Sequence, residues 1–355
     1  MAEKFGPFVS VLDLLKPKDK KSFRDALYPE GRPRAKSRRP RAANRIEELV
    51  LKVARTAVVE KEYIDLDFRA SYARFYIQRH LDLDRRCTRI HFFSCALSAA
   101  DLGALDLAAR RAYLGYVIIR PFTNHALGRS VFSEQVLRAS VPRDYETYLT
   151  CRANQRANLA GNELRFLGVP WMQQDNLVSA CASASLWVVN WHMSHRHVTE
   201  FRQFYSPEIT DIAVQSVMET GRAMPSAGLT MGQMMYALRE MGYDPLPVQG
   251  VNEQRVRTRL YQYVEGGIPV IINLETSDGG HAVTAVGHTF DRSRQFDIAA
   301  FEFENQKQPF VRSSEFVPHF VIQDDAYGPF SLLELVDWES AWADPKISTK
   351  LKEIT

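Results

Sequence analysis

The hydrophobic and polar positions in the C-terminal half of the chain predict helices first and strands afterwards. Apolar residues recur at helical spacing in three segments, from Cys181 to about His195, from Thr230 to Met241 and from Asn252 to Val264. Apolar runs typical of strands follow at Val270 to Leu274, Ala282 to Val286 and Phe316 to Gln323. The first two runs are separated by Asp278-Gly279-Gly280, which indicates an antiparallel hairpin. Helices followed by strands indicate an α+β fold in which the two kinds are segregated.

The N-terminal half shows short helical and strand patterns in alternation. Helices are expected at residues 44 to 59, from about Asp67 onward, and from Ser98 to Ala112. Strands are expected from Arg89 to Ser94 and from Tyr113 to Arg120, where a proline ends the run. No stretch here resembles a cofactor-binding loop. We therefore expect a mixed α/β region of unassigned role over residues 44 to 167, before a C-terminal domain over residues 168 to 345.

Residues 14 to 43 are rich in Lys, Arg and Pro and lack an apolar period. Between Arg32 and Arg45 the chain carries seven basic residues and no acidic one. Such a segment is typical of a solvated basic arm, and we expect residues 1 to 43 to be flexible. The whole chain has 45 Lys and Arg against 42 Asp and Glu, a net charge of +3. That balance is too even to indicate a nucleic-acid partner.

Composition excludes several classes of protein. With 45% hydrophobic residues the chain can bury a substantial core, so it is neither disordered nor collagen-like. No run approaches the ~18 apolar residues of a transmembrane helix, and the first residues show no secretory signal. The four cysteines lack the spacing of a metal knuckle or a disulfide framework: Cys87, Cys95, Cys151 and Cys181. We therefore expect a cytoplasmic protein that does not enter a membrane.

Cys181 gives the strongest chemical signal. Polar, turn-forming residues precede it, and a helix of small and apolar residues follows. A thiol in the first helical turn lies beside unpaired backbone N–H groups and the positive end of the helix dipole, which favour the nucleophilic thiolate. His281 follows Gly279-Gly280 and opens a strand, where a histidine is held rigidly and can accept the thiol proton. His288 is a competing base at the far end of the same strand.

Two further side chains can complete a catalytic site. Asp324 or Asp325, at the end of a strand, can accept the second ring N–H of His281 and fix its tautomer, and Asp324 is favoured. The side-chain amide of Gln174, together with the backbone N–H of the cysteine, can bind the oxyanion of a tetrahedral intermediate. Gln173 is the alternative for that role.

Two other clusters have simpler explanations. His192 and His195 lie one helical turn apart and suggest a metal site, but no further ligand stands at matching spacing. We interpret them as part of a solvated helix end. Asp65 and Asp67 suggest acid-base chemistry, and a capped, charged helix face explains them as well. We therefore expect neither a metal nor a cofactor.

The order Gln, Cys, His, Asp resembles that of papain-like cysteine peptidases, in particular the bacterial branch with the double-glycine leader peptidases of bacteriocin processing. The likeness lies between about residues 168 and 335, in Gln174 to Trp187, Ser226 to Tyr243, Gly267 to Val283 and Asp324 to Gly328. The resemblance implies a papain-like fold, with a helical lobe, an antiparallel sheet lobe and an added N-terminal region. It also implies that a peptide or protein is the substrate and that the catalytic residues are Cys181, His281, Asp324 and Gln174.

The sequence departs from the family pattern at several positions. Gln174 precedes the cysteine by seven residues, one more than is usual, and Asp325 stands where the family has proline. The interval from His281 to Asp324 is 43 residues, longer than the usual single hairpin. Residues 291 to 315 are therefore expected to form an inserted loop or extra hairpin on the active-site side, as a lid or a substrate-selecting element. No transporter segment or ATP-binding loop accompanies the domain, so the exporter role does not carry over.

The favoured hypothesis is a cysteine hydrolase that cleaves an amide or isopeptide bond through a thioester on Cys181, with His281 as the base. Two alternatives stay open. The same thioester can pass to an amine or alcohol, which is the reaction of an acyltransferase or a transglutaminase-like enzyme. The cleft can instead be a catalytically silent module that binds a peptide.

Overall fold

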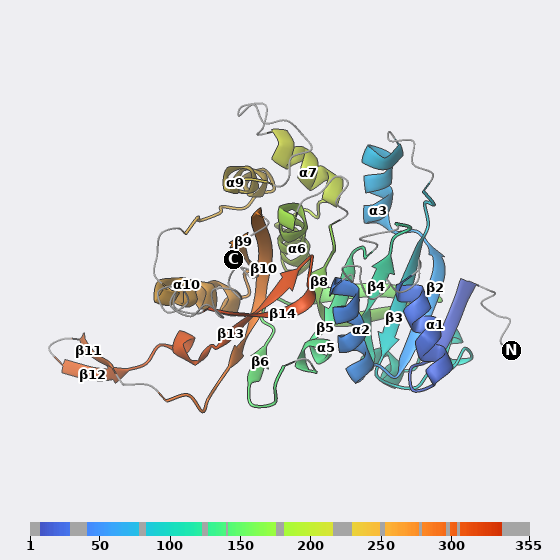
Figure 1. Cartoon of the computed structure of the whole chain (residues 1–355), viewed down its shortest axis with the longest axis horizontal. Helices are drawn as coiled ribbons and strands as arrows, with labels where there is room; N and C mark the ends of the chain where they lie inside the picture. Colours follow the sequence, from blue (N-terminus) through green and yellow to red (C-terminus); the bar gives the residue numbers. More distant parts are fainter. Residues whose placement is uncertain are drawn as a thin grey trace.

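The computed structural model of the chain contains two large antiparallel sheets with helices between and around them (Figure 1). It describes residues 8–28, 41–77, 83–122, 127–139, 141–174, 181–215, 229–248, 253–276, 279–295, 299–303 and 306–335. The fold is mixed α+β, as the sequence predicts. Over these ranges, no helix has both the length and the apolar character needed to cross a bilayer.

The first sheet has seven antiparallel strands in the order β1-β2-β3-β4-β5-β8-β7 and occupies the right half of Figure 1. Its strands are β1 (Val9–Asp13), β2 (Thr56–Tyr63), β3 (Cys87–Phe93), β4 (Tyr113–Ile119), β5 (Ser130–Ser133), β7 (Ala153–Leu159) and β8 (Asn162–Trp171). Every residue of β4 is buried, as expected for a central strand that is covered on both faces. At the edge, β7 alternates buried and exposed residues. The strands predicted at residues 89–94 and 113–120 are confirmed as β3 and β4.

The second sheet brings the candidate histidine and aspartate together. Its five strands are β6 (Glu146–Tyr148), β9 (Val270–Thr276), β10 (Gly279–Phe290), β13 (His319–Asp324) and β14 (Gly328–Glu334). The predicted hairpin is confirmed, because β9 and β10 pair antiparallel. β10 and β13 are also antiparallel, with Thr284 opposite Gln323. The start of β10 and the end of β13 therefore meet at one edge of the sheet, where His281 and Asp324 lie.

Helices pack on both sheets. They are α1 (Pro17–Leu27), α2 (Arg41–Val53), α3 (Leu66–Ser71), α4 (Leu107–Arg111), α5 (Glu134–Arg138), α6 (Cys181–Arg196), α7 (Ser206–Gln215), α9 (Met231–Glu240) and α10 (Glu253–Glu265). Tighter or wider turns occur at Tyr72–Tyr76 (π), Asp101–Gly103 (3₁₀) and Ser313–Phe316 (3₁₀). The three helices predicted in the C-terminal half are confirmed as α6, α9 and α10. Thr230 and Gln233 form a capping box at the start of α9.

Helix α6 lies between the two sheets and contacts strands of both (Figure 1). It is buried on almost every side, which is typical of a helix inside a core. Two hydrogen bonds fix it to β10. The hydroxyl of Ser185 donates to the carbonyl of Ala282 at 3.0 Å, and the hydroxyl of Thr284 donates to the carbonyl of Ser185 at 3.4 Å. Because Ser185 lies one helical turn after Cys181, these bonds fix the start of α6 relative to β10.

One hydrophobic core connects the two sheets. It includes, among others, Leu12, Ile46 and Phe92 from the N-terminal half and Trp187, Val283 and Val321 from the C-terminal half. The boundary expected at residue 168 falls inside β8. In addition, β6 belongs to the N-terminal half but pairs with β10 in the second sheet. The N-terminal α/β region therefore packs into the C-terminal part of the molecule.

The flexible arm expected over residues 1–43 is wrong for the part that the structure describes, since β1 and α1 lie within it. Phe23 and Leu27 of α1 are 0% and 2% exposed. Pro17 in the first turn and two apolar residues at i and i+4 are helix signals that the abundance of lysine conceals. Residues 29–40, which carry most of the basic cluster, lie outside the described residues.

Two helices predicted in the N-terminal half are shorter than expected. The helix expected over residues 44–59 ends as α2 at Val53, and the chain continues as β2. The β-branched side chains of Thr56 and Val58 favour the strand there. The helix expected over residues 98–112 is reduced to a 3₁₀ turn and the short α4.

The insertion between β10 and β13 contains the expected extra hairpin, formed by β11 (Ala299–Phe303) and β12 (Gln306–Phe310). It follows the end of β10 at Phe290, nine residues from His281. At about 3.3 Å per residue, that separation is about 30 Å. Figure 1 shows the hairpin at the outer end of the molecule, beyond α10. The expectation that the insertion lies on the active-site side is therefore wrong, because strand direction carries it to the opposite end of the sheet.

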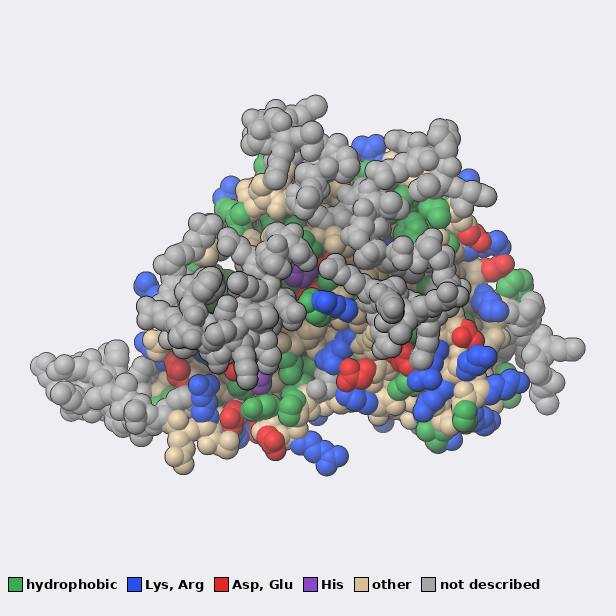
Figure 2. Space-filling model, viewed as in Figure 1, with side chains coloured by type: hydrophobic (Ala, Val, Ile, Leu, Met, Phe, Trp, Pro, Cys, Tyr) green, Lys and Arg blue, Asp and Glu red, His purple; other side chains and the backbone are tan. Residues whose placement is uncertain are grey.

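Charged side chains of both signs are mixed on the face shown in Figure 2, where basic and acidic groups lie next to each other. Ion pairs also join charged side chains of α1 and α2. On α2, Lys52 lies 2.7 Å from Glu48, and Glu47 pairs with Arg24 of α1. The described part of this face therefore shows no single basic patch.

Candidate active site

Cys181 is the first residue of α6, and its side chain is partly exposed. The first N–H groups of a helix have no partner within it, and their dipoles place positive charge at this end. The thiol lies in contact with the imidazole of His281, and this contact contributes to raising the pKa of the ring. The two residues are 100 positions apart in the sequence, and the packing of α6 on β10 brings them together.

His281 is the third residue of β10, and its backbone pairs with Leu274 in β9. This pairing holds the histidine near the beginning of a strand that has neighbours on both sides. The side chain is 18% exposed, so one part of the ring is open to solvent. On its other side, Nε2 lies 3.2 Å from Oδ1 of Asp324 and 3.9 Å from Oδ1 of Asp325. The imidazole therefore bridges the thiol and two carboxylates.

The carboxylate of Asp324 is fixed by the turn that follows β13. Its Oδ1 accepts the backbone N–H groups of Ala326 at 2.8 Å and Tyr327 at 3.0 Å. Its backbone carbonyl accepts the indole N–H of Trp171 at 2.7 Å. Within the described residues, Nε2 of His281 has no well-aligned hydrogen bond, so its contact with Asp324 is a close ion pair. Because two backbone N–H groups hold the carboxylate of Asp324 in place, it can still orient the ring.

Asp325 is a second buried acid beside the same ring. It is 4% exposed, and neither carboxylate oxygen has a hydrogen-bond partner in the described part of the chain. Burial and the negative charge of Asp324 raise the pKa of Asp325 to about 7, although the positive charge of His281 acts in the opposite direction. A buried carboxyl group without hydrogen bonds is costly, so this residue calls for an explanation beyond packing.

The protonation of His281 reflects opposing effects. Burial is the largest single influence and lowers its pKa, but the contacts with Asp324 and Cys181 and the charge of Asp325 outweigh it and raise the pKa to about 11. The ring is therefore an imidazolium at neutral pH.

Gln174, the residue predicted to bind the oxyanion, is the part of the predicted site for which the described residues show no contact. Gln174 is partly buried three residues after the end of β8, and the described residues show no hydrogen bond from it to the cluster. Gln173 is engaged elsewhere, because its side-chain oxygen accepts the N–H of Leu127 at 3.4 Å. Residues 175–180 lie outside the described residues. The role of Gln174 stays a prediction.

Two other histidines have structural roles. His288 is buried at the far end of β10, where its Nε2 lies 2.8 Å from Glu265, so it does not compete with His281. His192 is also buried, and its Nε2 lies 3.1 Å from the carbonyl oxygen of Gly267. The interpretation of a solvated helix end is therefore wrong for His192. Burial lowers its pKa to about 4, so the ring is neutral.

The acidic pair at α3 is buried too. Asp65 caps the helix as expected, because its side chain accepts the N–H of Phe68 at 2.9 Å, and it pairs with Arg129 at 2.5 Å. Asp67 accepts the backbone N–H and the hydroxyl of Ser206 at 2.9 and 2.7 Å. The cap is confirmed, but both carboxylates serve internal contacts and do not form an exposed charged face.

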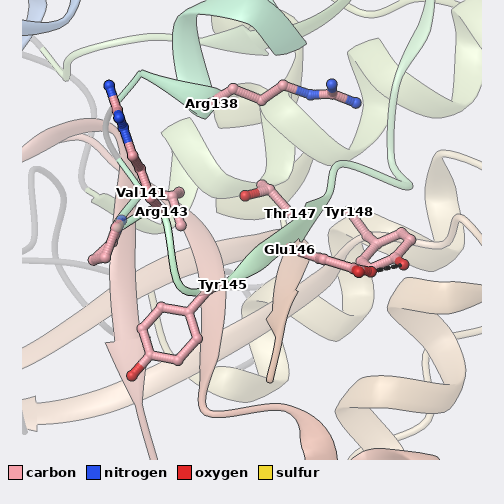
Figure 3. A pocket seen from close by; sticks show the side chains of 8 residues that line it. Arg138, Val141, Arg143, Tyr145, Glu146, Thr147 and Tyr148 are labelled. Atoms are coloured by element: carbon pink, nitrogen blue, oxygen red, sulfur yellow. Dashed lines mark hydrogen bonds between the residues drawn. The ribbon is translucent and has the colours of Figure 1, made fainter. Parts of the chain in front are cut away.

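A separate pocket of about 380 Å³ lies around β6 (Figure 3). It is lined by Arg138, Val141, Pro142, Arg143, Tyr145, Glu146, Thr147 and Tyr148. The hydroxyl of Tyr148 donates to Glu146 at 2.6 Å. Because β6 pairs with β10 at residues 288–290, the pocket lies at the end of the strand remote from His281. It is not part of the Cys–His–Asp cluster.

Sequence reasoning missed two residues that support the cluster. Ser185 fixes α6 to β10, and Trp171 holds the backbone of Asp324. A serine one turn after Cys181 inside an otherwise apolar helix is a signal that could have indicated the first contact. The second joins residues 153 positions apart and has no local signal.

Comparisons of the chain with protein-family models, with curated proteins and with solved structures found no match. Interpretation of the site therefore depends on its own residues and geometry. Three of the four expected residues, Cys181, His281 and Asp324, lie together, with Asp325 as an additional member.

Proposed function

We propose that this chain is a cysteine hydrolase with a papain-like arrangement, which cleaves an amide or isopeptide bond in a peptide or protein. One observation carries the proposal. The thiol that begins α6 contacts the imidazole of His281, whose Nε2 lies 3.2 Å from Oδ1 of Asp324. A thiol, an imidazole and a carboxylate in this order supply a nucleophile, a base and an orienting group.

In the proposed reaction, the thiolate of Cys181 attacks the carbonyl carbon, and the oxyanion of the tetrahedral intermediate faces the backbone N–H groups at the start of α6. Protonated His281 gives its proton to the leaving amine, and the acyl group stays on sulfur as a thioester. Water then attacks the thioester while the imidazole takes a proton from it. The acid product leaves and the thiolate–imidazolium pair is restored. Asp324 keeps the ring oriented throughout.

The layout of the fold supports the papain-like part of the proposal. A buried helix that begins with the nucleophile packs against an antiparallel sheet that carries the base and the acid (Figure 1). Helices α7 and α9 also contact α6 and extend the helical part. In this proposal, the seven-stranded sheet is an addition to the papain-like arrangement. All four cysteines are free, which suits a reducing compartment such as the cytoplasm.

Alkylation with iodoacetamide tests the proposal without knowledge of the substrate. Cys181 should react at least about tenfold faster than Cys95, the other partly exposed cysteine, because a thiolate is far more nucleophilic than a thiol. Burial raises the pKa of Cys95. Cys87 and Cys151 are buried and should react slowly for that reason alone, so Cys95 is the informative reference. Peptide mapping by mass spectrometry after short exposures gives the four rates.

His281→Gln is the matched variant, since glutamine is polar and of similar size but cannot act as a base. The rate at Cys181 should fall to about that of Cys95, whose own rate should not change. The proposal is contradicted if Cys181 reacts no faster than Cys95 in the unmutated chain. It is equally contradicted if His281→Gln folds normally and leaves the rate at Cys181 unchanged.

A further inference from the structure

His281, Asp324 and Asp325 form a compact set of side chains able to ligate a metal. One donor atom from each lies within 4.8 Å of the other two. Ligand atoms bound to one tetrahedral zinc ion lie roughly 3.3–3.8 Å apart, as follows from bond lengths of about 2.0–2.3 Å. The two measured separations between Nε2 and the carboxylates, 3.2 and 3.9 Å, bracket that range. Small side-chain movements would therefore complete a metal site.

Asp325 is the observation that favours a cation. The proposed reaction already has its nucleophile, base and orienting carboxylate without it. Asp325 is nevertheless 4% exposed, and both of its oxygens lack a hydrogen-bond partner among the described residues, as does Nε2 of His281. Buried polar atoms are normally paired. A cation between these three atoms would pair all of them at once.

We propose that these side chains bind Zn²⁺ through Nε2 of His281 and one oxygen each of Asp324 and Asp325, with water as the fourth ligand. One imidazole and two carboxylates are a donor set that zinc accepts. The two negative charges compensate a doubly charged ion that is largely removed from solvent. Cys181 is not a ligand, because its sulfur does not belong to the group of donor atoms that meet within 4.8 Å.

Bound zinc would inhibit the hydrolase. This consequence rests on the proposed function, but the binding of zinc does not rest on it. Zinc takes the place of the proton on Nε2, and that proton passes to the buffer. The ring then keeps its one proton on Nδ1. Loss of this proton to a leaving amine would leave an imidazolate, and Nδ1 has no lone pair to accept another proton. Zinc would therefore stop the proton transfers of both half-reactions.

Isothermal titration of the chelator-treated full chain with ZnCl₂ tests the site. One equivalent should bind, and Asp325→Asn, which keeps the shape but removes the charge, should weaken binding at least about tenfold. Cys181→Ser should bind zinc as tightly as the unmutated chain. His197→Gln removes a partly exposed histidine outside the cluster and is the matched control, with no expected change.

Zinc X-ray absorption on the loaded, unmutated chain gives a second readout that does not depend on the folding of a variant. The expected first shell contains nitrogen and oxygen at about 2.0–2.1 Å and no sulfur at about 2.3 Å. Sulfur in the shell, an absence of stoichiometric binding, or a normally folded Asp325→Asn with unchanged affinity each overturns the proposal. The alkylation test uses the metal-free chain. Its failure therefore counts only against the hydrolase, and failure of the titration only against the zinc site.

Discussion

Replacing Ser185 by alanine tests whether side-chain bonding between α6 and β10 holds the thiol at the imidazole. The change removes the 3.0 Å bond to the carbonyl of Ala282, while Thr284 can still donate to the backbone carbonyl of residue 185. Loss of one buried neutral hydrogen bond costs about 1–2 kcal/mol, so the free energy of unfolding should fall by about that amount. The side chain is buried, so water cannot readily replace the lost bond.

The same substitution should slow the alkylation of Cys181. Ser185 lies one helical turn after the cysteine, and Ala282 directly follows His281, so their bond joins the two backbone segments that carry the reacting pair. A misplacement of ~1 Å between reacting groups can cost about a hundredfold in rate. Because the bond from Thr284 remains, we expect a smaller effect, a decrease of about three- to tenfold.

Ser194→Ala is the matched control for this experiment. Ser194 is buried in the same helix, but its hydroxyl donates within the helix to the carbonyl of Trp191 at 3.1 Å. It should lose a comparable amount of stability and leave the rate at Cys181 unchanged. Urea denaturation followed by circular dichroism and short pulses of iodoacetamide measure the two quantities. If Ser185→Ala is alkylated as fast as the unmutated chain, the positioning argument is refuted.

Acid should destabilise the protein through two buried histidines, because burial lowers the pKa of His91 and of His192 to about 4. The unfolded chain takes up these protons near pH 6.5, so the free energy of unfolding should fall by roughly 3 kcal/mol per histidine between pH 6.5 and 4. In His91→Gln, the fall in the free energy of unfolding between pH 6.5 and 4 should be smaller by the part due to one histidine. Urea denaturation at several pH values measures it, and an unchanged pH dependence would count against the argument. Asp324→Asn keeps an oxygen acceptor for its turn but removes the charge beside the imidazole, so alkylation of Cys181 should slow about tenfold or more. Trp171→Phe removes the bond to the backbone of Asp324 and should lower stability by about 1–2 kcal/mol, measured by urea denaturation; unchanged stability would argue against this anchor.

The sequence was sufficient to indicate Cys181, His281 and Asp324 as candidates, because each lies at the end of an element with a local signal. Cys181 begins a helix after polar residues, His281 follows paired glycines, and Asp324 ends an apolar strand. The hairpin between β9 and β10 could likewise be predicted from its turn residues. These signals depend on neighbouring positions alone and need no knowledge of tertiary packing.

Features that depend on strand direction and burial were not predictable in the same way. The side of the sheet on which residues 291–315 emerge follows from the pairing of β10 with β13, which no local pattern encodes. The burial of Asp325 follows from how the chain turns from β13 into β14. In α1, the two apolar residues that face the core form only a short pattern. The basic composition of the segment, which favours a flexible arm, was therefore the stronger signal.

Strand β6 makes the two halves of the chain interdependent. It comes from the N-terminal half and pairs with part of one edge of β10. In addition, β8 extends past residue 168 and packs against α6. A fragment that began near residue 168 would leave the edge of β10 and one side of α6 uncovered, and unpaired strand edges promote aggregation. Gene dissection at that point should therefore yield insoluble polypeptides, and recombination in evolution would have to transfer the two halves together.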